Sequence, residues 1–135
     1  MKKLAIAIAG ILTGGLAQAD NLEGVDTMIC AASQVNICLE NDTCYSATPA
    51  QLGVPDFVVI DTGKKTISTT KASNENRSTS FTSIEKNDGL IYLQGIEGQR
   101  AFSFVIDEAT GRMTVSVARD GLSVSVFGAC TDTNL

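Results

Sequence analysis

Residues 100–128 carry the pattern that decides the fold: RAFSFVIDEATGRMTVSVARDGLSVSVFG. In three short runs, apolar side chains occupy every second position and small or polar side chains fill the positions between them. Such alternation is typical of strands that bury one face of an antiparallel sheet. The separators Asp107–Gly111 and Asp120–Gly121 are typical of hairpin turns, where glycine accepts a positive φ. We therefore predict strands at 100–106, 112–118 and 121–128.

The same two-residue period continues upstream and predicts four more strands, at 56–60, 65–70, 78–86 and 89–94. Turn residues gather at 61–64, 87–89 and 95–98, and the polar stretch 71–77 is expected to be an exposed loop. Regularly spaced strands and turns favour an all-β fold, and 135 residues fit one domain. We expect an antiparallel meander of about seven strands that forms a barrel-like or sandwich sheet.

The chain begins with a pattern typical of a secretory signal peptide at residues 1–19. Lys2 and Lys3 precede an uncharged apolar run at 4–16, and Ala17-Gln18-Ala19 has the small-x-small form of a cleavage site. We predict cleavage between Ala19 and Asp20. The apolar run is shorter than the ~20 residues that span a bilayer, so no transmembrane anchor is expected in the mature chain. The expected location is the periplasm or the outside of a bacterial cell.

Residues 20–135 are then one exported β-domain, with a cysteine-containing segment at 20–55 and the meander at 56–130. Within the first segment, residues 28–30 and 35–39 could form two short strands. Residues 48–55 are expected to be a linker, in which Pro49 could open one helical turn. We expect disulfides to tie this segment to the meander.

Four cysteines in an exported chain favour two disulfides. We favour Cys38–Cys44, because the residues between them, 40–43, resemble a turn; Cys30–Cys130 is then the second bond. A zinc site is the competing interpretation, but the spacings lack the paired CxxC knuckles of structural zinc sites.

The chain has no histidine, and this excludes catalytic sites, metal sites and pH switches that depend on a histidine side chain. Its formal charge of −5 argues against nucleic-acid binding. We predict no cofactor and no metal. Four arginines could form an anion-binding face, although scattered, solvated charges are the interpretation that we favour: Arg77, Arg100, Arg112 and Arg119.

One short string, FVVIDTG at 57–63, offers a remote catalytic candidate. It resembles the active-site signature of aspartic proteases, in which an apolar strand runs into Asp-Thr-Gly. The resemblance implies a dimer in which two copies of Asp61 share a proton. Lys64 and Lys65 stand where that family usually has Ala or Ser. We favour a hairpin turn at this position.

The sequence favours a non-enzymatic binding or interaction domain of the bacterial envelope with a protein partner that the sequence does not name. One version is a periplasmic inhibitor of a basic hydrolase such as lysozyme, because the acidic charge would speed the encounter. Two further hypotheses are an aspartic-protease-like hydrolase that uses Asp61 and a structural surface component that self-assembles. The oligomeric state stays open.

We predict that thiol titration of the folded, non-reduced protein finds no free cysteine, because all four are paired. Titration after denaturation without reductant should give the same result. Two or more titratable thiols would contradict the disulfide prediction.

Overall fold

The computed structural model describes residues 21–134 and confirms the all-β fold. The predicted signal peptide and its cleavage between Ala19 and Asp20 lie outside the described residues. Two short 3-10 helices, η1 and η2, interrupt the strands. The bounds are β1 Thr27–Leu39, β2 Cys44–Ala47, η1 Ala50–Leu52, β3 Phe57–Asp61, β4 Thr66–Thr69, η2 Lys71–Ser73, β5 Ser78–Ser80, β6 Ser83–Asn87, β7 Leu90–Glu97, β8 Arg100–Asp107, β9 Arg112–Arg119 and β10 Leu122–Asp132.

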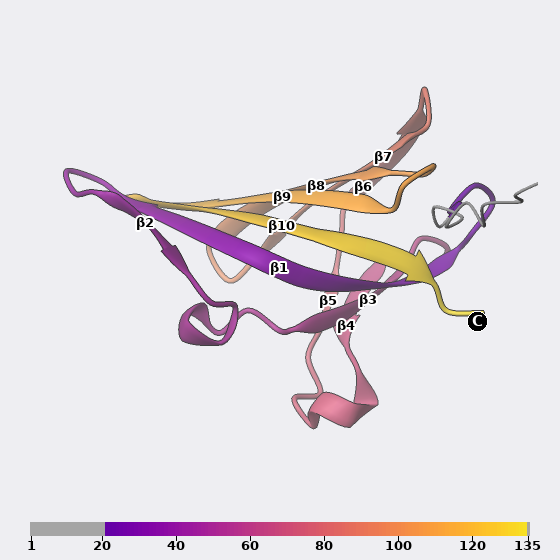
Figure 1. Ribbon diagram of the computed structural model, residues 1–135, viewed down its shortest axis with the longest axis horizontal. Coiled ribbons are helices and arrows are strands. Elements are labelled where there is room, and N and C mark those ends of the chain that lie inside the picture. The colour runs from indigo at the N-terminus through magenta and orange to yellow at the C-terminus, as the bar shows by residue number, and fades with distance from the viewer. Residues whose placement is uncertain (1–20, 135) are drawn as a thin grey trace, which may run out of the picture.

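All strands belong to one antiparallel sheet that curls into a half-barrel (Figure 1). The strand order is β5-β4-β3-β1-β10-β9-β8-β7-β6, and β2 pairs with the part of β1 that lies beyond β3. The cysteine-containing segment thus supplies the central strand of the sheet. Its two expected short strands form one strand of 13 residues, β1, which pairs with β10 over almost its whole length.

A β-bulge in β1, between Ala32 and Gln34, changes which residues face the inside of the curl. The hydroxyl of Ser33 donates a hydrogen bond of 2.9 Å to the carbonyl of Phe127 across the bulge. Because of the extra residue, Val35 and Ile37 point to the same side of the sheet as Cys30, and both are buried. The bulge therefore keeps the apolar side of β1 turned inward along its length.

Both predicted disulfides are confirmed, Cys30–Cys130 and Cys38–Cys44. Each bond joins two residues that stand directly opposite one another in the strand ladder, the first between β1 and β10 and the second between β1 and β2. The first and last strands of the domain are therefore covalently joined at their pairing.

The predicted strand 78–86 is two strands, β5 and β6, which lie at opposite edges of the sheet. Two residues make the transition. The backbone N–H of Phe81 donates to the carbonyl of Lys65, at the first edge, over 3.0 Å, and the N–H of Thr82 donates to the carbonyl of Gln94, in β7, over 2.8 Å. The chain thus draws the two edges together at one end of the half-barrel, where the side chain of Phe81 is buried.

The prediction of a turn beginning at Gly95 is wrong, because β7 continues to Glu97 and the turn is formed by Gly98 and Gln99, both with positive φ. Gly95 lies within the strand for a packing reason. A β-carbon at this position would overlap the ring of Phe102 on the neighbouring strand.

A compact core fills the end of the half-barrel where β1 begins and β10 ends. The backbone N–H of Leu22, ahead of β1, donates to the carbonyl of Glu108 over 2.7 Å, which holds the N-terminal segment against this end. The largest fully buried side chains are Leu22, Met28, Ile60, Ile91, Leu93 and Ile106.

The predicted turn between β8 and β9 is confirmed. A carboxylate oxygen of Asp107 accepts the N–H groups of Ala109 and Thr110, at 2.9 and 3.0 Å, and Gly111 closes the turn with φ +73°. The hydrogen bond from the N–H of Thr110 favours the ionised form and so holds the pKa of the Asp107 carboxyl below its usual value.

Replacing the junction residue, Phe81→Ala, should lower the free energy of unfolding by about 3–5 kcal/mol, because it empties a buried site. Phe57→Ala is the matched control: Phe57 is 51% exposed, so its loss should cost less than about 1 kcal/mol. Urea denaturation of the oxidised proteins measures both. Equal destabilisation by the two changes would contradict this role of Phe81.

Asp107→Asn should destabilise the protein at neutral pH and lose this effect in acid. A carboxyl whose pKa is lowered by folding contributes stability above its unfolded value, ~3.9, and loses it as the pH falls through the folded pKa. The melting temperatures of the two proteins should therefore converge as the pH falls below ~3.9 and through the folded pKa. A difference that stays constant as the pH falls through this range would argue against the turn carboxylate as a source of stability.

Candidate functional site

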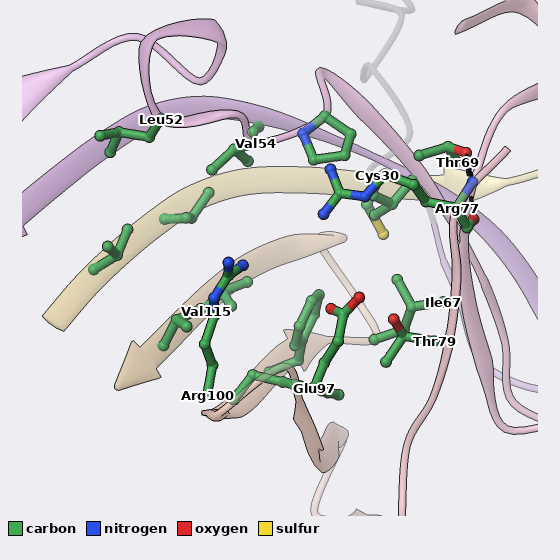
Figure 2. Close-up of a pocket in the computed structure, with 18 of the residues that line it drawn as sticks. Cys30, Leu52, Val54, Ile67, Thr69, Arg77, Thr79, Glu97, Arg100 and Val115 are labelled. Atoms are coloured by element: carbon green, nitrogen blue, oxygen red, sulfur yellow. Dashed lines mark hydrogen bonds between the residues drawn. The ribbon is translucent and has the colours of Figure 1, made fainter. Parts of the chain in front are cut away.

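The inner side of the curled sheet borders a cavity of about 310 Å³ that is partly open to solvent (Figure 2). Its floor consists of the same alternating apolar residues that predict the last three strands. They reach the cavity because successive side chains of a strand point to opposite faces. The apolar lining residues of these strands are Phe102 and Phe104 of β8, Met113, Val115 and Val117 of β9, and Leu122, Val124 and Val126 of β10.

The opposite wall comes from the connection between β2 and β3 and from the strands beyond it. The expected helical turn after Pro49 is present as η1, and the N–H groups of Leu52 and Val54 donate to the carbonyl of Pro49 over 3.2 and 2.9 Å. This fold of the connection brings Leu52 and Val54 to the cavity, which Val58 of β3 and Ile67 of β4 also line.

Several apolar side chains of the cavity are only partly buried. Phe104, Val117, Leu122 and Val124 all retain solvent exposure, in contrast to the closely packed core at the other end. Water contacts these apolar groups in the isolated protein. A ligand that displaced this water would therefore gain hydrophobic free energy.

Four charged side chains also line the cavity: Arg77, Arg100, Arg119 and Glu97. Arg77 approaches from the side of β5, and Arg100 and Glu97 approach from the end of the β7–β8 hairpin (Figure 2). Three of the four arginines of the chain thus line one cavity. All three side chains are exposed, as expected for solvated charges, and they line the same cavity.

Arg77 is anchored from two directions. Its guanidinium Nη1 donates to the carbonyl of Gly53, next to η1, over 3.2 Å. Its backbone N–H donates to the hydroxyl of Thr69 over 2.9 Å. Among the hydrogen bonds of residues 21–134, the guanidinium groups of Arg100 and Arg119 take part in none. These two groups keep all their donors for water or a ligand.

Arg112 is the arginine that does not line the cavity. It lies at the start of β9, seven positions before Arg119. Because an odd separation places two residues of a strand on opposite faces, Arg112 lies on the convex face of the sheet.

The remote catalytic candidate Asp61 lies at the end of β3, where its carboxylate accepts the N–H of Lys64 over 2.8 Å in the β3–β4 hairpin. Thr62 is buried and donates from both its N–H and its hydroxyl to the carbonyl of Asp26. Asp61 is not among the residues that line the cavity. Its catalytic role stays a prediction.

The convex face carries a row of polar side chains that crosses seven strands. Neighbours in the row stand directly opposite one another in the ladders. The hydroxyl of Ser46 donates to the side-chain oxygen of Asn36 over 2.8 Å. The row consists of Ser46, Asn36, Ser125, Ser116, Ser103, Gln94 and Ser83.

Sequence reasoning missed the cavity, although the strand pattern held a signal for its charged residues. Arg100 precedes Phe102 by two positions, and Arg119 follows Val117 by two positions. Both arginines therefore continue the apolar phase of their strands, and this places them on the inner side. Glu97 likewise follows Gly95 by two positions in β7, so both residues lie on the same side of the strand.

Comparison of the chain with protein-family models, with curated proteins and with solved structures finds no match. Within residues 21–134, no helix has the length and apolar character needed to cross a membrane. In the same part of the chain, no three His, Cys, Asp or Glu side chains gather as a metal site would require.

Proposed function

We propose that this protein is an exported, non-enzymatic binding protein of the cell envelope whose concave cavity holds a small apolar ligand. The observation that carries the proposal is the cavity of about 310 Å³ with its partly exposed apolar lining. Ligand sites in proteins are commonly clefts of ~300–1,000 Å³ with mainly apolar walls and a few polar groups.

The architecture supports a preformed site. The cavity lies on the inner side of the central pair β1 and β10, which the Cys30–Cys130 disulfide joins, and Cys30 itself lines the cavity. A wall that is already ordered loses little conformational entropy when a ligand enters, so more of the hydrophobic gain appears as affinity. The two disulfides also support an oxidising compartment, in line with export.

The cavity favours a small ligand over the protein partner that the sequence suggested. A protein partner that docked on the convex face of the sheet would leave the inner apolar residues Phe104, Val117 and Val124 in contact with water. Occupation of the cavity covers these side chains directly. Inhibition of a basic hydrolase, self-assembly and the Asp61 hydrolase remain hypotheses with no comparable feature of the described residues behind them.

Titration with N-phenylnaphthylamine, a neutral apolar fluorescent probe, tests the proposal. The oxidised protein should bind one equivalent, with the increase in emission that an apolar environment gives. Val117→Trp should weaken this binding about tenfold or more, because the larger side chain occupies the cavity; tenfold corresponds to ~1.4 kcal/mol.

Ala118→Trp is the matched control, since Ala118 is the next residue of β9 and lies exposed on the convex face. It should leave the probe affinity unchanged. Urea denaturation of both variants establishes that they are folded. Absence of saturable probe binding to the unaltered protein, or equal loss in the two variants, would overturn the proposed function.

A further inference from the structure

We infer that the ligand is a single-chain amphiphile with an anionic head group, bound with its head at Arg100 and Arg119 and its apolar chain in the cavity. The inference rests on the proposed function and adds the chemical class of the ligand and the residues that select it.

The charge of the cavity is opposite in sign to that of the chain. Acidic residues exceed basic ones by 15 to 10 in the whole sequence. Among the residues that line the cavity, three arginines face a single acid, Glu97. All four charged side chains are exposed beside the apolar wall, so water and salt screen them in part and the net positive charge of the lining acts over a short range. The cavity therefore favours an anion over a neutral or cationic molecule.

The two arginines at the end of β8 and β9 form a pair. Ala101 stands opposite Ala118 in the β8–β9 ladder. The next position along the same register therefore places Arg100 opposite Arg119. Like charges that face each other across a ladder are unfavourable by themselves. Glu97, opposite Arg100 in the β7–β8 ladder, balances one of the two. One positive charge remains at this pair, which matches a head group with a single negative charge.

The position of the pair relative to the apolar residues defines an amphipathic site. Behind Arg119 the inward residues of β9 are Val117, Val115 and Met113, and behind Arg100 those of β8 are Phe102 and Phe104. From Arg119 to Met113 the strand rises by ~20 Å. A ligand with its anionic end at the arginines would extend an apolar chain along this run.

The opposite wall of the cavity carries a third guanidinium group, that of Arg77. Arg77 is fixed by its bond to the carbonyl of Gly53, and its guanidinium has five donors, of which this bond uses one. Guanidinium groups bind carboxylate and phosphate oxygens with two parallel hydrogen bonds. The site is therefore suited to either head group.

Four ligands with the same alkyl chain test the inference by isothermal titration calorimetry with the purified, oxidised protein, below the concentrations at which they form micelles. They are dodecanoate, dodecyl phosphate, dodecanol and dodecyltrimethylammonium. At least one of the two anions should bind roughly tenfold or more tighter than dodecanol, and the cation should bind most weakly. The advantage of the anion should decrease as salt concentration rises.

Variants separate head-group recognition from the cavity itself. Arg100→Gln and Arg119→Gln should each weaken binding of the preferred anion roughly tenfold and leave dodecanol unchanged. Arg112→Gln removes the same charge from the convex face of β9 and should change neither affinity.

The outcomes distinguish the two proposals. Dodecanol affinity equal to that of both anions, or an equal effect of Arg112→Gln and Arg119→Gln, would overturn the anionic head group while the cavity function stands. Absence of binding for all four ligands would overturn the cavity function together with this inference.

Discussion

The pairing of β1 with β10 is the constraint on which the rest of the structure depends. It joins the first strand of the domain to the last, and the Cys30–Cys130 bond holds it across a sequence separation of 100 residues. In the chain-entropy model, closing a loop of that length stabilises the fold by about 4.7 kcal/mol. Without this pairing, the strands β6 to β10 and the strands β3 to β5 would lack the centre that makes them one sheet.

Close packing around this pair leaves no room for side chains at two glycines. A β-carbon at Gly128 of β10 would overlap the carbonyl of Ala31 in β1, and one at Gly111 would overlap the carbonyl of Cys130. The N–H of Cys130 also donates to the carbonyl of Gly111 over 2.7 Å. The turn between β8 and β9 thus rests on the strand that carries the disulfide. Gly128 allows the close approach of β10 to β1 next to the bulge in β1, and Gly111 allows the close approach of the β8–β9 turn to β10. Larger residues at these two positions would prevent both contacts.

The curl has a chemical consequence. A flat sheet with this alternation would expose its whole apolar face to water, whereas the half-barrel closes one end with a core and leaves a cavity toward the other. The connection through Phe81 draws the two edges together at the closed end. The unfilled part of the inner face therefore forms the cavity that we propose as a binding site, with arginines where the apolar strands of β8 and β9 end.

Local pattern determined much of this protein. The two-residue period placed the strands 100–106, 112–118 and 121–128 to within a few residues, because alternation and hairpin residues act between neighbours along the chain. Turn residues also placed the Asp107–Gly111 turn and favoured the Cys38–Cys44 bond, and Cys30–Cys130 then followed as the remaining pair. The two-residue period also set which side of each strand is apolar, and thereby the inward phase of Arg100 and Arg119.

Long-range pairing decided the rest. Two features depend on partners that are distant in sequence: the central position of β1 and the division of 78–86 between the two edges of the sheet. The place of Gly95 inside β7 depends on the ring of Phe102 from the next strand. The cavity depends on the curl of the whole sheet. By itself the sequence determined the strands, their apolar faces and the cysteine pairing. The tertiary structure alone decided strand order and the gathering of Arg77, Arg100 and Arg119 around one cavity, because a periodic pattern carries no information about which distant strand lies alongside.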